Sequence, residues 1–140
     1  MNNLSFFETS GFSMWPFLKA GTKLIIKQAP VEDLKIGDII LYRANDKLIC
    51  HRLVKKNTEK GRYRLYAQGD NSAFLPEFIT EQALLGKAVG IIKNGKVVSL
   101  TSRSRRFANR IIVVIAPMIK AAAKITWPCY VKLRNGKNKR

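Results

Sequence analysis

Turn-forming dipeptides recur at short intervals through residues 1–100, and this spacing limits the possible fold more than any other feature of the sequence. Asn94-Gly95 is a strong hairpin signal, and Asn45-Asp46 reverses the chain between two apolar runs. The runs between such turns are short and rich in β-branched residues, which is typical of strands. We expect strands over residues 23–27, 39–43, 48–55, 62–68, 89–92 and 97–100. The sequence therefore predicts a mainly β domain, a coiled sheet or partly open barrel of short strands.

The segments between these strands are expected to be short connectors. They are a one-turn connector over residues 31–35, a polar loop over 57–61, a turn over 69–72 and a loop over 76–84 with a short helix from 80. Residues 4–7 fit either a short helix or a short strand.

The character of the chain changes at Arg103, where a helical pattern begins. We divide the chain into a β domain over residues 1–102, a helical appendage over 103–131 and a basic, disordered tail over 132–140. Pro117 is expected to kink the helix. Its basic residues fall within about one third of the helical circumference, and the rest is mostly apolar. These residues are Arg103, Arg106, Arg110, Lys120 and Lys124.

Three placements of this helix are open. A bilayer span needs about 20 apolar residues, and each central lysine costs about 2.5–3.5 kcal/mol on insertion scales, whereas the run from Ile111 to Trp127 contains two lysines. We therefore favour a helix lying in the head-group plane, with Trp127 and Tyr130 as interfacial anchors. A true span is one alternative, and packing on the β domain or on a second copy of it is the other.

The net charge of +17 indicates an anionic partner. The N-terminal residues have no basic segment followed by an apolar run, so we expect neither a signal peptide nor an N-terminal anchor.

Cys50 and Cys129 lack metal-site spacing and are expected to be free thiols, with a single bridge as the alternative. We expect peripheral membrane association, at the cytoplasmic face.

Ser13 is a candidate nucleophile. It lies in a segment where Gly11 permits a tight backbone and Pro16 restrains the residue before it. This turn holds one hydroxyl among bulky apolar side chains, and we expect Phe12, Met14 and Trp15 to contact substrate. A serine in such a turn is commonly only a turn residue, unless a base and an orienting group lie elsewhere in the chain.

His51 and Asp70 are the candidates for those two groups. His51 is the single histidine, and an imidazole with an ordinary pKa of about 6.5 can accept the serine proton and return it to a leaving amine. Its side chain should share a strand face with Ile49 and Leu53. Asp70 could hold the imidazole in one tautomer. Each also fits a structural role, as a half-buried histidine and as an Asx turn.

Four motifs follow one another along the chain: Ser13-Met14-Trp15-Pro16, Gly37-Asp38-Ile39-Ile40, His51-Arg52 and Gly69-Asp70-Asn71. Their order and spacing resemble those of type I signal peptidases, whose superfamily includes self-cleaving repressors. The archaeal and endoplasmic-reticulum branch is most similar, with Ser-Met-x-Pro, Gly-Asp-Ile-Val, His-Arg and Gly-Asp-Asn. The resemblance covers about residues 10–100. It implies that Ser13 is the nucleophile, His51 the general base and Asp70 the supporting acid, with the Ser13 N–H in the oxyanion hole.

The sequence departs from this pattern in several ways. Typical bacterial members have a lysine where His51 stands, and a hydroxyl donor where Gly11 stands. The family normally has an N-terminal membrane anchor, whereas 12 residues precede Ser13 here. The large second β domain of many bacterial members is also missing. The basic helix could supply membrane attachment from the other end.

We therefore expect a serine endopeptidase that processes a signal or leader peptide by a Ser-His(-Asp) acyl-enzyme mechanism, without metal or cofactor. Its partners would be a peptide or pre-protein and an anionic membrane surface. A non-enzymatic basic module for anionic membrane or nucleic acid is the alternative, although no nucleic-acid fold signature is present. An inactive peptide-binding relative is another. A self-cleaving repressor is less favoured, because it needs a DNA-binding domain and a scissile segment before Ser13.

Overall fold

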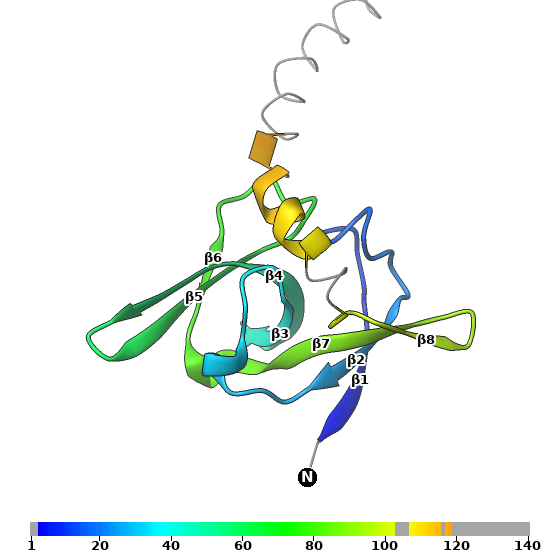
Figure 1. The fold of residues 1–140 in the computed structure, drawn as a ribbon, viewed down its shortest axis with the longest axis horizontal. Coiled ribbons are helices and arrows are strands. Elements are labelled where there is room, and N and C mark those ends of the chain that lie inside the picture. Colours follow the sequence, from blue (N-terminus) through cyan, green and yellow to red (C-terminus); the bar gives the residue numbers. More distant parts are fainter. Residues whose placement is uncertain (1–2, 103–106, 116, 119–140) are drawn as a thin grey trace, which may run out of the picture.

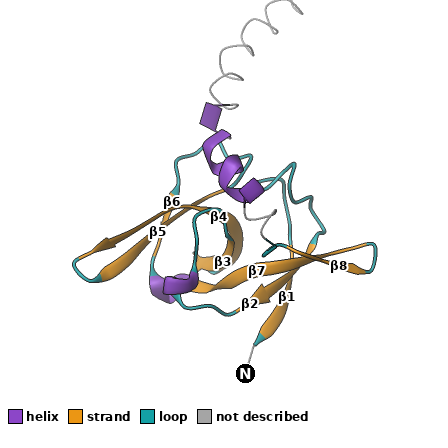
Figure 2. Cartoon of the chain, viewed as in Figure 1, coloured by secondary structure: helices purple, strands orange, loops and turns teal. Residues whose placement is uncertain are grey.

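The chain folds around one antiparallel sheet whose strands are joined by tight turns (Figures 1 and 2). The computed structural model describes residues 3–102, 107–115 and 117–118. Its strands are β1 (Leu4–Glu8), β2 (Lys23–Lys27), β3 (Ile39–Ala44), β4 (Lys47–Glu59), β5 (Arg62–Gln68), β6 (Glu77–Ile79), β7 (Leu84–Lys93) and β8 (Lys96–Ser99). Two short 3₁₀ turns, η1 (Val31–Asp33) and η2 (Glu81–Ala83), lie before β3 and β7. The prediction of a mainly β fold is confirmed.

The sheet is open and curls around its central strand, β3 (Figure 1). Its order is β1-β2-β7-β3-β4-β5-β6, and β8 pairs with the far half of β7. Ile39 and Leu41 of β3 belong to one buried cluster, whereas Ile40 and Tyr42 belong to a second cluster on the other face. Because neighbouring strand residues point to opposite faces, β3 is buried on both sides and reads as a continuous apolar run.

Three hairpins set the register of the sheet. In the turns Asn45-Asp46, Lys60-Gly61 and Asn94-Gly95, both residues have positive φ, between 47° and 74°. Two such residues in succession give the turn whose twist matches the twist of the flanking strands. The resulting hairpin between β3 and β4 places Ile40 opposite His51 and Tyr42 opposite Ile49.

Two sequence predictions about loops were wrong. Residues 57–59 belong to β4, which continues through the predicted polar loop because Glu59 pairs with Arg62 and forms an ion pair with Arg64. Residues 77–79 form β6, paired with β5, where the sequence predicted a loop. Polar side chains obscured the end of β4, and β6 is only three residues long, too short to show a strand pattern.

A helix over residues 107–115 and 117–118, which we call the helical segment, follows the sheet. It approaches the loop before β3 closely, because a Cβ added at Gly37 would lie 3.1 Å from the backbone carbon of Asn109. These residues, Pro117 among them, fall within the predicted helical appendage, and the kink predicted at Pro117 is untested because residue 116 lies outside the described part. The predicted anchors Trp127 and Tyr130 also lie outside the described residues. No helix in the described part of the chain has the length and apolar content to cross a bilayer.

Candidate active site

Ser13 sits at the rim of the first core cluster, on the loop between β1 and β2. Met14 and Leu18 are buried in that cluster, and the Leu18 N–H donates to the Met14 carbonyl over 2.9 Å. The Thr9 hydroxyl closes the base of the loop by donating to the Lys19 carbonyl over 2.7 Å. The two buried anchors fix the loop, while the Ser13 residue itself remains exposed.

The turn after β5 holds the Ser13 loop from the other side. The Asn71 N–H donates to the Ser13 carbonyl over 2.8 Å, and the Asn71 amide donates to the Phe12 carbonyl over 3.4 Å. This contact joins two of the four sequence motifs, which lie more than fifty residues apart.

Gly69 lies beside both the serine and the histidine. A Cβ added at Gly69 would lie 3.0 Å from Ser13 Cβ and 3.2 Å from His51 Nε2, and only 2.6 Å from the Ser13 carbonyl oxygen. Ser13 Cβ and His51 Nε2 are therefore separated by no more than the sum of the first two distances. Absence of a side chain at Gly69 is what lets the two predicted residues approach each other.

His51 is held by a tyrosine. Its Nδ1 lies 3.1 Å from the hydroxyl oxygen of Tyr42, and that hydroxyl donates to Glu77 Oε2 over 2.7 Å. Burial lowers the pKa of His51, while the charges of Glu77 and Asp70 act in the opposite direction. The neutral imidazole, which is the form that can accept a proton, is therefore favoured at neutral pH.

Asp70 does not make the contact that the sequence predicted. Arg52 Nε donates to Asp70 Oδ1 over 2.8 Å and Arg52 Nη2 donates to Oδ2 over 2.7 Å, so both carboxylate oxygens accept a hydrogen bond. The third arm of Arg52 donates to the Gly37 carbonyl over 2.9 Å. The two side chains are 2% and 4% exposed. The correction has a physical reason: a buried guanidinium binds a carboxylate in two places at once, which one imidazole nitrogen cannot do.

Ser13 and His51 line one pocket of about 280 Å³. Its apolar walls come from Phe7, Met14, Leu18, Leu48, Ile49 and Cys50. Of the three predicted substrate contacts, Met14 lines this pocket, whereas Phe12 and Trp15 are not among its walls and are exposed. Burial raises the pKa of Cys50 to about 12, so its thiol stays neutral and serves as a wall.

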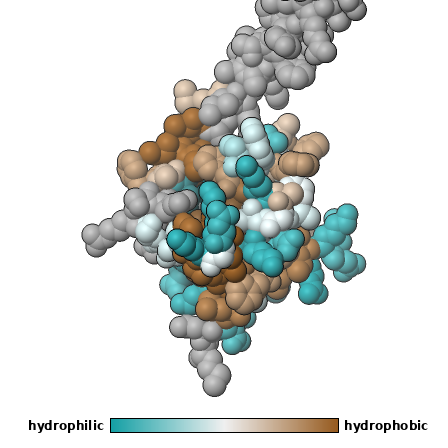
Figure 3. Space-filling model, turned by 90° about the vertical axis from the view of Figure 1, so that its right-hand side faces the viewer, coloured by the Kyte–Doolittle hydropathy of each residue, from teal (hydrophilic) through white to brown (hydrophobic). Residues whose placement is uncertain are grey.

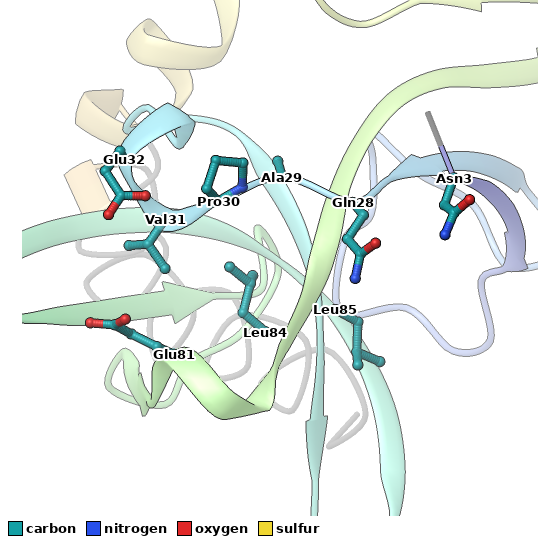
Figure 4. A pocket seen from close by; sticks show the side chains of 9 residues that line it. All are labelled: Asn3, Gln28, Ala29, Pro30, Val31, Glu32, Glu81, Leu84 and Leu85. Carbon is teal, nitrogen blue, oxygen red and sulfur yellow. The ribbon is translucent and has the colours of Figure 1, made fainter. Parts of the chain in front are cut away.

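Another pocket, of about 550 Å³, lies elsewhere on the domain (Figure 4). It is lined by residues of η1, η2 and the start of β7, among them Glu32, Glu81 and Leu84. Neither Ser13 nor His51 borders it, so the predicted chemistry maps to the smaller pocket alone.

Sequence reasoning missed Tyr42 and Glu77 as neighbours of His51. The position of Tyr42 near His51 was predictable, because the Asn45-Asp46 hairpin fixes the pairing of β3 with β4. That register puts Tyr42 two residues from Ile40, the partner of His51, and on the same face. The position of Glu77 was not predictable, since it depends on the short strand β6.

Comparison with known proteins bears on the whole of this region. The family model described as Peptidase S24-like matches residues 1–98, which include all four motifs and the whole sheet apart from the last residue of β8. A comparison with curated proteins gives no match. The match fits a serine peptidase or a self-cleaving protein of the repressor type and does not single out the signal-peptidase branch. The chain belongs to the peptidase S24-like family.

Proposed function

We propose that this protein is a serine endopeptidase in which Ser13 attacks a peptide bond with His51 as the general base. One observation supports it above the others: Ser13 and His51 Nε2 both lie close to Gly69, and both residues line one pocket. Among the described residues the Ser13 hydroxyl makes no hydrogen bond, so it is available to the imidazole once a substrate brings the loop into its reacting geometry.

The reaction proceeds through two acyl transfers. Ser13 Oγ forms a bond to the scissile carbonyl carbon while its proton passes to His51 Nε2. Collapse of the tetrahedral intermediate breaks the C–N bond, and the His51 proton goes to the departing amine. A water molecule then attacks the ester by the same route and returns the Ser13 hydroxyl. Nothing is oxidised or reduced, and no cofactor enters these steps.

The Ser13 backbone N–H is the proposed oxyanion donor. It makes no hydrogen bond within the described part of the chain, and it belongs to the nucleophile itself, so a carbonyl under attack lies within reach. Such a donor contributes about 2.7–4 kcal/mol to transition-state stabilisation in serine peptidases. Because Gly11 brings no hydroxyl, the proposal relies on backbone donors.

The apolar pocket suggests which substrates are cut. Its volume is about 280 Å³, and its walls are partly apolar, with Thr9, Ser10 and Lys47 as polar lining residues besides Ser13 and His51. Such a pocket suits one small or medium apolar side chain next to the cleaved bond. Motif resemblance to the archaeal and endoplasmic-reticulum signal peptidases favours a leader or signal peptide as the natural substrate.

We further propose that the protein works at an anionic membrane surface. Large apolar side chains are exposed on the loops beside the site, including Phe12 at 70%, Phe74 at 83% and Leu75 at 90%. Both loops lie at the same end of the molecule as the helical segment (Figure 1), and apolar surface is present at this end as well as lower on the molecule (Figure 3). Apolar surface combined with a net charge of +17 suits an interface of acyl chains and anionic head groups.

Cleavage of a peptide library tests the proposed activity. Wild type, Ser13→Ala and His51→Ala are incubated with the library, and new peptide termini are identified by mass spectrometry. We expect wild type to generate termini with small or medium apolar residues at the cut, and both variants to lose them. Ser99→Ala, which removes a hydroxyl on β8, is the control. Termini that persist in Ser13→Ala would overturn the proposal.

A further inference from the structure

A buried phenol lies between the imidazole and a carboxylate. Tyr42 is 1% exposed, and its hydroxyl oxygen is within hydrogen-bond distance of His51 Nδ1 on one side and Glu77 Oε2 on the other. The three residues come from three strands, β4, β3 and β6. Neither the motifs nor the family match assigns a role to Tyr42 or Glu77.

The protons in the hydrogen-bonded series His51–Tyr42–Glu77 can be placed by counting donors. The carboxylate of Glu77 has only acceptor oxygens, so the Tyr42 O–H donates to it. A phenol has one proton, and the oxygen of Tyr42 can therefore meet His51 Nδ1 only as an acceptor. His51 must then carry its proton on Nδ1 and leave the lone pair on Nε2, the nitrogen next to Ser13.

Two observations exclude other arrangements. Burial, followed by the hydrogen bond to Glu77, raises the pKa of Tyr42 far above its usual range, so the phenol keeps its proton and does not act as an anion. Asp70 makes no hydrogen bond to His51 in the described part of the chain, where its two oxygens accept from Arg52.

We propose that Tyr42, supported by Glu77, is the positioning residue that fixes the tautomer of His51 and aims its basic nitrogen at Ser13. A phenol with a carboxylate behind it thus occupies the place that an aspartate fills in a Ser-His-Asp triad. The consequence for catalysis rests on the proposed function, whereas the tautomer does not.

The hydrogen bonds of Tyr42 and Glu77 also stabilise the His51 imidazolium that forms during the reaction. His51 keeps its Nδ1 proton throughout, and the Nδ1–H bond to Tyr42 strengthens when the ring becomes charged. Glu77 is an exposed residue, so water screens its charge and its effect is smaller than that of a buried aspartate. We expect loss of the phenol oxygen to cost about 10- to 100-fold in kcat, less than loss of the base itself.

The tautomer can be measured directly, because His51 is the only histidine. Protein labelled with ¹⁵N in histidine gives two ring-nitrogen signals whose shifts show which nitrogen carries the proton. At a pH where the ring is neutral, we expect wild type to be protonated at Nδ1. In Glu77→Gln the new amide can donate to Tyr42, whose O–H then donates to Nδ1, so the proton should move to Nε2.

Tyr42→Phe removes the acceptor and should give a mixture of the two tautomers. Tyr66→Phe and Glu32→Gln are the matched controls, because Tyr66 is a half-buried tyrosine on β5 and Glu32 an exposed acid on η1. Both should retain the wild-type signals. Protonation of wild type at Nε2, or unchanged signals in both Tyr42→Phe and Glu77→Gln, would overturn the proposal.

Kinetics with a cleaved peptide separate this proposal from the proposed function. Tyr42→Phe and Glu77→Gln should lower kcat and leave KM nearly unchanged, and a Tyr42→Phe protein with wild-type kcat would refute the positioning role. Undiminished cleavage by Ser13→Ala refutes the proposed function, while the ring-nitrogen signals still decide the tautomer.

Discussion

Asp70 accepts two hydrogen bonds from Arg52, at 2.8 and 2.7 Å, and this buried pair fixes the turn on which Gly69 and Asn71 contact the Ser13 loop. The pair thereby links the second, third and fourth motifs, since Arg52 also donates to the Gly37 carbonyl. Its role is to build the site, and its charge reaches His51 only through space.

Asp70→Ala should destabilise the protein strongly. It leaves the Arg52 guanidinium buried without its partner, which typically costs about 3–5 kcal/mol in free energy of unfolding. Urea denaturation followed by tryptophan fluorescence measures the change. Glu59→Ala breaks the exposed Glu59–Arg64 pair and should cost about 1 kcal/mol or less. Equal losses in the two variants would contradict the structural role of Arg52–Asp70.

Gly69→Ala should abolish most of the activity. Its Cβ would lie 2.6 Å from the Ser13 carbonyl, so the loop must move away from His51, and overpacking of this kind costs about 1–3 kcal/mol. Peptide cleavage at saturating substrate measures the effect. Gly90→Ala is the matched control, because its Cβ would have ordinary contacts of 3.4 Å and longer. Wild-type cleavage by Gly69→Ala would show that Ser13 and His51 do not need this approach.

Activity should depend on the protonation of His51. Its neighbours are Tyr42, Glu77 and Asp70, and burial lowers its pKa despite the opposing carboxylates. The acid limb of the kcat/KM profile is therefore expected below pH 6.5, with activity rising as His51 loses its proton. Glu77→Gln removes a charge that raises this pKa, so its acid limb should move to lower pH. An acid limb at or above pH 7 would contradict this description.

The lowered pKa of His51 also predicts that the free energy of unfolding depends on pH. Between the folded and the unfolded pKa of His51, the unfolded chain binds more protons than the folded protein. Stability is therefore complete above about pH 6.5 and is lost as the pH falls toward the lower folded pKa. Denaturant titrations of wild type and His51→Ala over pH 5–8 measure the difference. His51→Ala should show a shallower decline at acid pH, and a steeper one would reverse the sign of the shift.

Membrane binding should require the exposed apolar loops. Phe74→Ser with Leu75→Ser removes two of the most exposed apolar side chains and should weaken co-sedimentation with anionic phosphatidylglycerol vesicles at least several-fold. Val97→Ser is the control, since Val97 is 67% exposed but lies on the β8 hairpin. Binding that survives the double change, or equals that to neutral vesicles, would contradict the proposed surface.

Much of the fold was readable from local chemistry. The β-branched runs and the alternation over residues 62–68 predicted β2, β3 and β5. The Asn-Asp and Asn-Gly turns predicted most of the β3–β4 and β7–β8 hairpins. Each of these signals depends on residues close in sequence. The end of β4 was not predicted because its residues are mostly polar and are held by pairing with β5, and β6 was not predicted because it has only three residues.

The site was predicted only in part, because some of its contacts depend on residues far apart in sequence. Ser13 and His51 were found through motif order, and Gly69 was part of a motif whose close packing only the structure explains. Asp70 was assigned to the histidine, although strand alternation already predicts that Arg52 faces away from His51. A single sequence does not reveal that Arg52 takes the Asp70 carboxylate. Tyr42 was within reach of register reasoning, whereas Glu77 depended on a strand that was not predicted.

Acylation of Ser13 tests the central claim most directly. The protein is mixed with a peptidyl p-nitrophenyl ester bearing a small apolar residue at the acyl position, and intact mass is followed over time with peptide mapping. The account predicts an acyl adduct on Ser13 in wild type, none in Ser13→Ala, and formation slowed at least about 100-fold in His51→Ala. An adduct on another residue, or an undiminished rate in His51→Ala, would contradict it.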